Sequence, residues 1–585
     1  MCAFRNNASS CFATSFFVVE VLATISLSAG CETSGPPPEP ATSVEVAAAT
    51  AEQAAQFPRG VVKVTEGVFV AVGYGLANSV LLVGDGGVVV VDTMESIEAA
   101  TPVREAFREI SADPVAAMIY THNHGDHILG AGLLAANSHP EVIAHDSFLG
   151  ELDRLVTATR AVSYRRSMRQ FGTMLSQAQR IHCGIGPRLL NDATTTVAPL
   201  LPTKTFKGDR MELEIAGIRM ELLHLPGESP DQIGVWLPDK RVLLAGDNYY
   251  HAFPNLYAIR GTPSRSTLEW TKSLDRMRKL RAEYLVPGHT LPVEGEDEIY
   301  ARLTDYRDAI QFTHDQTLRG MNMGLGPDEI AETLRLPKSL ASKPWLAQHY
   351  GRLDWSVRAV FDGYLGWFDG DAANLSPLPK KERAAHLAQL AGGPDKLRDA
   401  AEAALAAGEA RWAVELADHL LLLKQFPEEA GRVRAAGLRM LAAVEPSANG
   451  RNYYTTQALE AEGRLTVAPL DASRFPRAVL ETISIGDFLQ AMSRRLDPTK
   501  AEGKLLKVGF RFPDVGEEWG MQLRNSVIEL RPELPDGADM TVTTSSLVWK
   551  EVLTSQRNAT VAFASGDLQV DRNRLELVRF LFLFR

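Results

Sequence analysis

A group of potential metal ligands, close together in the sequence, constrains this chain more than any other feature. His122, His124, Asp126 and His127 follow directly after residues 115–120, an apolar run typical of a buried β-strand. Imidazole nitrogens and carboxylate oxygens suit Zn²⁺ and similar first-row metals. A polar loop with scattered histidines is the alternative, but a His-x-His-x-Asp-His run after a strand is far more specific than a lone histidine. The pattern predicts a metal site on the loop beyond the strand, with enough ligands for two ions.

Three more potential ligands follow later apolar runs. Glu228, Asp247 and His289 each come after a strand-like segment and a glycine turn. Loops beyond the ends of such strands carry functional side chains and bring them to one edge of a sheet. We therefore expect these three residues to complete the site that the histidine run begins.

The histidine run resembles the motif of the metallo-β-lactamase superfamily, whose fold is an αββα sandwich with metal ions at the sheet edge. That superfamily has histidine, aspartate and histidine on the three later loops, whereas this chain has Glu228 on the first. Glutamate at this position is similar to the alkylsulfatases, and residues 248–261 and 358–370 resemble two segments of the same family. Asp247 is a departure from that family, which usually has glutamate there.

The resemblance implies a site with two Zn²⁺ ions per chain, which would activate a water molecule at neutral pH. The implied metal ligands are His122, His124 and Glu228 for one ion and Asp126, His127 and His289 for the other, with Asp247 touching both. The implied catalytic residues are Asp126 and Asp247, and the implied substrate-binding residues are Asn255, Arg260 and Tyr364. Arginine suits a sulfate ester because its planar fork meets a tetrahedral oxyanion at two points.

Sequence patterns change along the chain, whose 585 residues are too many for a single core. Residues 59–300 alternate between β and α patterns, and the resemblance implies a metallo-β-lactamase-type catalytic domain of the α/β class. Residues 301–450 have the pattern of antiparallel helix hairpins, and the resemblance implies an all-α dimerisation domain and a homodimer. Residues 475–585 resemble a small α+β sterol-carrier-protein-like domain, with one strand expected over residues 520–530. Such a domain would bind an apolar chain.

The amino-terminal part has the outline of an export signal. Residues 1–31 contain an apolar segment followed by small residues and Cys31, which resembles a lipoprotein cleavage box. Residues 32–58 have the composition of a flexible linker. We expect the protein in the periplasm or cell envelope, with membrane contact only through a lipid on Cys31. A disordered or wrongly assigned start is the alternative.

The charge balance limits the partners. A formal net charge of −11 gives no general field for nucleic acid, so an anionic substrate needs a local basic pocket. A helix is expected over residues 151–179, and it carries Arg154, Arg160, Arg165, Arg166 and Arg169. Two interpretations remain open for these arginines: a solvated face, or a lid that brings positive charge to the site.

The sequence leaves two classes of function. The first is a hydrolase of alkyl sulfates that releases an alcohol and inorganic sulfate. The alternative is a hydrolase of another ester, such as a phosphodiester, lactone or thioester. A lipid-binding lipoprotein without activity would leave the complete ligand set unused. Glu228 and Asp247 are expected to make the metal pair less positive than an all-histidine set, which suits a substrate that carries its own negative charge.

Overall fold

The computed structural model describes residues 42–135, 138–154, 158–192, 194–469, 477–572 and 574–584. The expected signal over residues 1–31 lies outside the described residues. Within the stretch expected as a flexible linker, residues 32–58, the structure contains helix α1 (Ser43–Ala54). A capping box between Thr42 and Glu45 begins this helix, and Gln53 donates to the carbonyl oxygens of two residues far away in the sequence. Among the residues described, none of the helices has the length and apolar character that a bilayer span requires.

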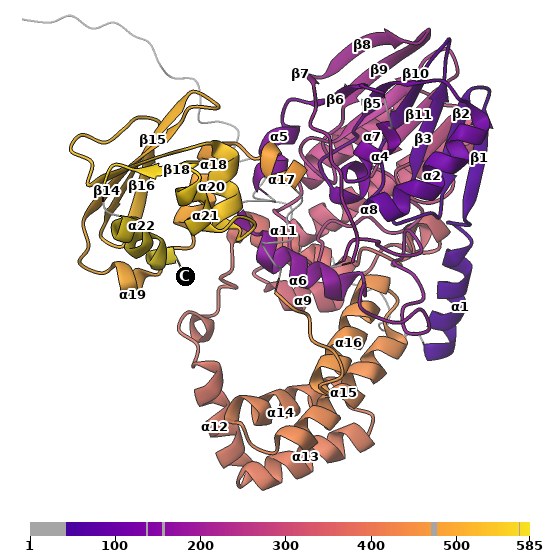
Figure 1. The fold of residues 1–585 in the computed structure, drawn as a ribbon. Helices are drawn as coiled ribbons and strands as arrows, with labels where there is room; N and C mark the ends of the chain where they lie inside the picture. Colours follow the sequence, from indigo (N-terminus) through magenta and orange to yellow (C-terminus); the bar gives the residue numbers. More distant parts are fainter. Residues whose placement is uncertain are drawn as a thin grey trace, which may run out of the picture. The chain divides into compact units, whose positions relative to one another are not determined.

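Two sheets face each other in the first part of the chain (Figure 1). The first sheet has seven strands in sequence order: β1 (Gly60–Thr65), β2 (Val68–Val72), β3 (Ser79–Val83), β4 (Val88–Val91), β5 (Val115–Ile119), β6 (Glu141–His145) and β7 (Lys204–Phe206). The second has the order β13 (Val293–Glu294), β12 (Tyr284–Pro287), β11 (Val242–Gly246), β10 (Ile233–Leu237), β9 (Ile218–His224) and β8 (Arg210–Ile215). Strands β4 to β7 run parallel to one another, and β11 runs parallel to β12.

Three apolar layers hold the sandwich together. The central layer joins side chains of both sheets, such as Val89 and Ile119 from the first and Val235 from the second. Helix α2 (Ile97–Ile110) packs Val103 and Phe107 on the outer face of the first sheet, and α7 (Thr267–Lys279) packs on the outer face of the second. Because both faces of each sheet are covered, β4, β10 and β11 are buried over their whole length. The predicted αββα sandwich is confirmed.

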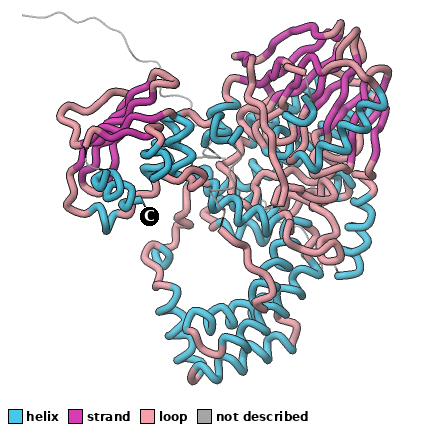
Figure 2. Tube along the Cα trace, viewed as in Figure 1, coloured by secondary structure: helices cyan, strands magenta, loops and turns pink. Residues whose placement is uncertain are grey.

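A stretch of helices follows (Figure 2). Its members are α8 (Glu296–Asn322), α9 (Pro327–Thr333), α10 (Lys338–Ala341), α11 (Leu353–Leu365), α12 (Lys380–Ala391), α13 (Pro394–Ala406), α14 (Ala410–Leu423), α15 (Pro427–Val444) and α16 (Ala448–Ala461). Ala404, Ala413 and Ala417 lie in the core of the later helices, so the backbones approach closely. Helix α8 crosses the expected domain boundary at residue 300, because Leu303 and Tyr306 complete the core beneath the second sheet.

The last part of the chain is a separate α+β core. Its sheet has the order β16 (Val527–Arg531), β15 (Glu517–Arg524), β14 (Leu506–Phe512), β17 (Met540–Thr544) and β18 (Leu568–Val570). Helices α18 (Ile485–Ser493), α20 (Ser546–Leu553) and α22 (Arg574–Leu581) accompany it. The single strand expected over residues 520–530 is a hairpin instead. Asn525 and Ser526 have φ angles of 51° and 57°, the left-handed conformation that a tight hairpin turn requires.

Candidate active site

All seven predicted metal ligands lie at one edge of the sandwich, on loops beyond strand ends. His122 and His124 follow β5, and Asp126 and His127 belong to the short helix α3 (Gly125–Ile128). The other three ligands lie on the loops after β9, β11 and β12 of the second sheet: Glu228, Asp247 and His289. The αββα arrangement therefore brings ligands from both sheets together.

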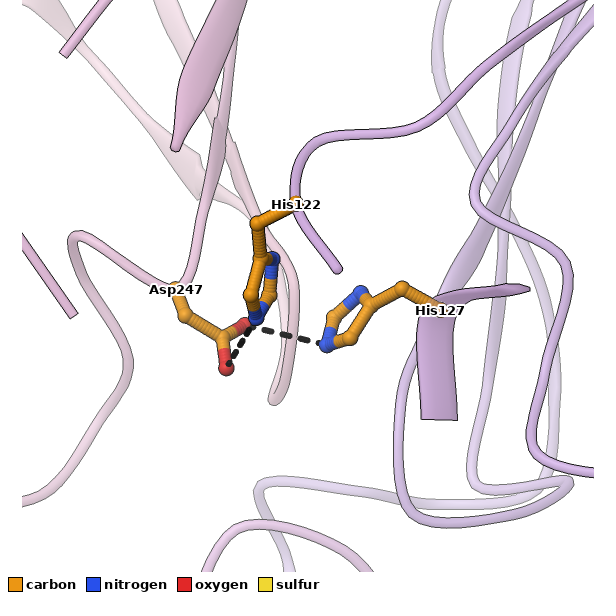
Figure 3. Close-up of side chains that lie close together, drawn as sticks. All are labelled: His122, His127 and Asp247. Atoms are coloured by element: carbon orange, nitrogen blue, oxygen red, sulfur yellow. Dashed lines mark ion pairs between the residues drawn. The ribbon is translucent and has the colours of Figure 1, made fainter. Parts of the chain in front are cut away.

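The ligand atoms form three groups, in each of which they lie within 4.8 Å of one another. The groups are His122, His127 and Asp247; Asp126, His127 and His289; and His124, Glu228 and Asp247. The carboxylate of Asp247 is central: one oxygen lies 3.4 Å from Nε2 of His127, and the other lies 3.7 Å from Nε2 of His122 (Figure 3). The second oxygen is also 3.2 Å from Nε2 of His289. Asp247 therefore lies among ligand atoms of two groups, and its contact with both metal ions stays a prediction.

Hydrogen bonds from behind orient the histidine rings. Nδ1 of His127 lies 2.8 Å from Oδ2 of Asp92, and Nδ1 of His289 lies 2.7 Å from the carbonyl oxygen of Leu76. Asp92 is held in turn by the backbone N–H and the hydroxyl of Thr121, each at 2.8 Å. Such partners fix the tautomer and direct the other ring nitrogen to the metal. Sequence reasoning missed Asp92, although an aspartate that ends a run of four valines was a visible signal.

Charge and burial prepare these groups for a cation. Burial holds the pKa of His122 and His124 well below 6.5, so both rings are neutral and can offer a lone pair. Burial also acts to raise the pKa of Asp247, but the neighbouring histidines outweigh it and keep that pKa well below its usual range. His122 and His124 are therefore neutral beside an ionised Asp247. Burial acts to lower the pKa of His127 and His289, but Asp247 and other nearby carboxylates outweigh it and raise both pKa values, so a metal ion must displace a proton from these two rings.

Two observations fit a metal at this place. Nε2 of His127 and Oδ1 of Asp247 are buried, and neither has a hydrogen-bond partner among the described residues. Unpaired buried polar atoms are costly unless something else satisfies them. In addition, a Cβ on Gly288 would lie 2.3 Å from Oδ1 of Asp247, so any residue other than glycine at this position would clash with the carboxylate. The donor set of imidazoles and carboxylates suits a first-row divalent ion.

Glu228 has a buried cationic partner that the sequence did not indicate. Nη1 of Arg265 lies 2.9 Å from Oε1 of Glu228, and both side chains are almost fully buried. The hydroxyl of Tyr250 donates to Oε2 of Glu228 at 3.3 Å. Burial raises the pKa of Glu228 to about 6, and the guanidinium of Arg265 acts in the opposite direction. The guanidinium of Arg265 therefore balances the negative charge of Glu228. The sequence suggested that Glu228 would make the site less positive, but this cationic partner offsets that effect.

The ligand edge opens into a cavity that Arg260 shares. His124, Glu228, Asp247 and His289 line this cavity together with Arg260, whose Nη2 lies 3.4 Å from Nε2 of His124. Apolar side chains also line it, among them Phe148, Met168 and Phe171. A cationic group beside the metal ligands and an apolar wall can accommodate an anionic head and an alkyl tail.

The other two predicted substrate residues lie elsewhere. Asn255 is buried, and its side-chain amide has no hydrogen-bond partner among the described residues, but Asn255 is not one of the residues that line the cavity. Tyr364 is 53% exposed on α11, with its hydroxyl 2.9 Å from Nε2 of His314. Tyr364 is not one of the residues that line the cavity, and its role in substrate binding stays a prediction. Tyr350 lines the cavity instead, and no sequence motif pointed to it.

The arginine-rich segment fits both interpretations in part, the solvated face and the source of positive charge at the site. Helix α6 (Arg160–Gln170) ends well before the predicted end at residue 179, because Gly172 has a left-handed φ of 56°. Arg160 lines the cavity, whereas Arg165 is exposed. Arg166 donates to the carbonyl oxygen of Ile259 at 2.9 and 2.6 Å, next to Arg260. The segment is therefore partly a wall of the cavity and partly a solvated face.

The fold and the site define a metal-binding hydrolase of the metallo-beta-lactamase superfamily, whose family model matches residues 72–289. Residues 326–464 match the model for alkyl sulfatase dimerisation, and residues 475–585 match the model for the alkyl sulfatase C-terminal region. The chain belongs to the alkylsulfatase family.

Relatives of this family resemble the chain over most of its length. A linear primary-alkylsulfatase of a Pseudomonas species is 35% identical over 85% of this chain and 97% of its own. An alkyl/aryl-sulfatase of Saccharomyces cerevisiae is 30% identical over 90% of this chain and 82% of its own. The solved structure of a stereoselective inverting sec-alkylsulfatase from Pseudomonas sp. superimposes with a TM-score of 0.85 at 27% identity, covering 92% of this chain and 86% of that chain.

Proposed function

We propose that this protein is a dinuclear zinc hydrolase that cleaves alkyl sulfate esters to an alcohol and inorganic sulfate. One observation carries the proposal: seven potential ligands form three groups, with Asp247 in two of them, and five of the seven line the same cavity as the cationic Arg260. The relatives include a linear primary-alkylsulfatase and an (R)-specific secondary-alkylsulfatase, which supports the same substrate class.

The ligand groups support two ions. His124 and Glu228 serve one position, Asp126 and His289 serve the other, and Asp247 lies between them. Three imidazole or carboxylate ligands per position, with a further position left open, are typical of catalytic zinc. Zinc held there supplies Lewis acidity and a water molecule that ionises near neutral pH. Asp126 and Asp247 would hold the metal through their carboxylate oxygens.

The residues around the metal ligands provide for the substrate. Arg260 offers a planar fork to the oxygens of the sulfate group as negative charge develops on the leaving group. Phe148, Met168 and Phe171 offer an apolar surface to the alkyl chain. Asn255 lies five residues before Arg260 and supports this loop through its backbone.

The decisive experiment uses the full chain loaded with zinc. Sulfate release from dodecyl sulfate is expected, with two zinc equivalents by elemental analysis. His124→Ala should abolish turnover, while circular dichroism still reports the folded helices. Hydrolysis of bis(p-nitrophenyl) phosphate or of a lactone, without sulfate release from dodecyl sulfate or a secondary alkyl sulfate, would contradict the proposed substrate class.

Two further parts of the proposal concern assembly and location. The match of residues 326–464 to a dimerisation model and the exposure of Trp367 and Leu375 support a homodimer, which light scattering at several concentrations tests. The apolar run before Cys31 supports an anchored protein of the cell envelope. A Cys31→Ser form that fractionates with membranes as strongly as the parent would refute the anchor.

A further inference from the structure

We propose that Arg265 is a positioning residue that fixes Glu228 as a metal ligand and ties this ligand to the loop that carries Arg260. The inference rests on the proposed dinuclear site and deepens it. Its evidence is the ion pair between Arg265 and Glu228, whose side chains are 2% and 3% exposed. Two charges are rarely buried this completely unless each balances the other.

Both oxygens of the Glu228 carboxylate are engaged from behind. Nη1 of Arg265 lies 2.9 Å from Oε1, and the hydroxyl of Tyr250 donates to Oε2 at 3.3 Å. Oε1 is also the atom that lies 3.9 Å from Nδ1 of His124. Because the carboxylate is held at both ends, its orientation toward His124 is set before any metal arrives.

The same two partners also hold Asn255. The backbone N–H of Asn255 donates to the hydroxyl of Tyr250 at 2.8 Å, and Arg265 donates to the carbonyl oxygen of Asn255. Glu228, Tyr250, Asn255 and Arg265 therefore form a closed ring of polar contacts. One member of the ring, Glu228, is a predicted metal ligand, and another, Asn255, belongs to the loop that leads to Arg260. A change at Arg265 should affect both.

Arg265 acts from outside the cavity. Among the described residues that line it are Glu228 and Arg260 but not Arg265. Arg265 thus positions the groups that meet metal and substrate, without meeting either. The ion pair also alters the expected effect of Glu228→His. The histidine would leave the buried guanidinium of Arg265 without its counter-charge, so the single change should weaken zinc binding by more than the replacement of one ligand alone would.

The test measures zinc binding to the full chain by competition with a chelator. Arg265→Met should weaken the affinity of one of the two zinc equivalents by about 10- to 100-fold, the usual effect of removing a residue that orients a ligand. Arg265→Lys, which keeps the charge but loses the fork, should fall between Met and the parent. Arg276→Met is the matched control, because Arg276 donates to the backbone carbonyls of His224 and Asp209. Unchanged zinc affinity in Arg265→Met would overturn the proposal.

A double variant separates positioning from general stability. Glu228→His alone is expected to bind the affected zinc poorly, and Glu228→His with Arg265→Met should bind it at least tenfold more tightly than the single variant. A double variant no better than Glu228→His would overturn the pairing, even if Arg265→Met alone failed to fold. If the parent binds two zinc ions but releases no sulfate from dodecyl sulfate, the proposed substrate class fails, whereas the zinc measurements on Arg265 remain valid.

Discussion

Asp92 contacts His127 at the nitrogen that faces away from the ligand cluster, with 2.8 Å between Oδ2 and Nδ1. The contact leaves Nε2 of His127 free of hydrogen bonds to described residues and directed at Asp247. A residue outside the ligand set therefore decides which nitrogen of the imidazole is available.

The first prediction concerns Asp92→Asn. The side-chain amide of asparagine has no negative charge, so it is a weaker hydrogen-bond acceptor for His127 and Thr121 than the carboxylate of Asp92. The imidazole of His127 therefore becomes a weaker and less well oriented metal ligand. Zinc affinity should fall by about 10- to 100-fold in a chelator competition. Asp113→Asn, at an exposed carboxylate that contacts Ser111, should bind zinc like the parent. Equal affinities in both variants would contradict the orienting role of Asp92.

Gly288→Ala should displace Asp247. The new Cβ would lie 2.3 Å from Oδ1 of Asp247 and about 3 Å from the backbone of Gly246, and neither can move without disturbing the strand end. We expect fewer than two zinc equivalents by elemental analysis and loss of sulfate-ester hydrolysis, with the helices still folded. Gly150→Ala is the control, since its Cβ would meet nothing within 4 Å. Two tightly held zinc equivalents in Gly288→Ala would be the contrary result.

Gln170→Ala tests the support of the Arg260 loop. Oε1 of Gln170 accepts the backbone N–H of Arg260 at 2.7 Å, so the change leaves that donor unpaired and the loop less fixed. KM for dodecyl sulfate should rise roughly tenfold, equivalent to about 1.4 kcal/mol, while zinc content stays at the parent value. Arg165→Ala on the exposed face of the same helix should leave KM unchanged. A parental KM in Gln170→Ala would show that Arg260 needs no such support.

Stability should depend on pH through His182. Burial lowers the pKa of this histidine from 6.5 to about 4, and the charge of Arg451 acts in the same direction. The contact of the ring with the carbonyl oxygen of Thr50, at 3.0 Å, only partly opposes them, and Nδ1 accepts the backbone N–H of Gly184. Between these pH values the unfolded chain binds a proton that the folded chain does not, so stability falls as pH drops from about 6.5 to about 4. The full contribution is about 3 kcal/mol.

Calorimetry of His182→Gln checks this dependence. The variant should lose less of its melting temperature than the parent over the same interval of pH. His386→Gln, at an exposed histidine on α12, should follow the parent throughout. Identical pH profiles for His182→Gln and the parent would remove His182 as the cause.

The sandwich and its ligands were predictable because their signals are local. Each ligand follows a strand end within a few residues, and the fold carries those strand ends to one edge. Arg265 gave no such signal: a lone arginine becomes a partner of Glu228 only when two loops meet in space. Tyr350 was missed for the same reason. Tyr364 was predicted from a motif, and in the structure its hydroxyl lies 2.9 Å from Nε2 of His314. The hairpin at Asn525 and Ser526 escaped because neither residue is glycine.

The ion pair between Arg169 and Glu460 has a consequence for how this enzyme can be divided. Both nitrogens of the Arg169 fork meet the carboxylate, at 2.8 and 2.7 Å, and so α6 is fastened to α16. Tyr350 also reaches the cavity from beyond residue 300. A fragment cut at that residue would keep every predicted ligand of the metal site. It would lose Tyr350 from the cavity lining, and it would lose Glu460, which holds helix α6 through Arg169. The smallest fragment of this chain with full activity is therefore expected to extend past α16. A chimaeric protein that takes only the residues before 300 from this chain should bind zinc without accepting the substrate.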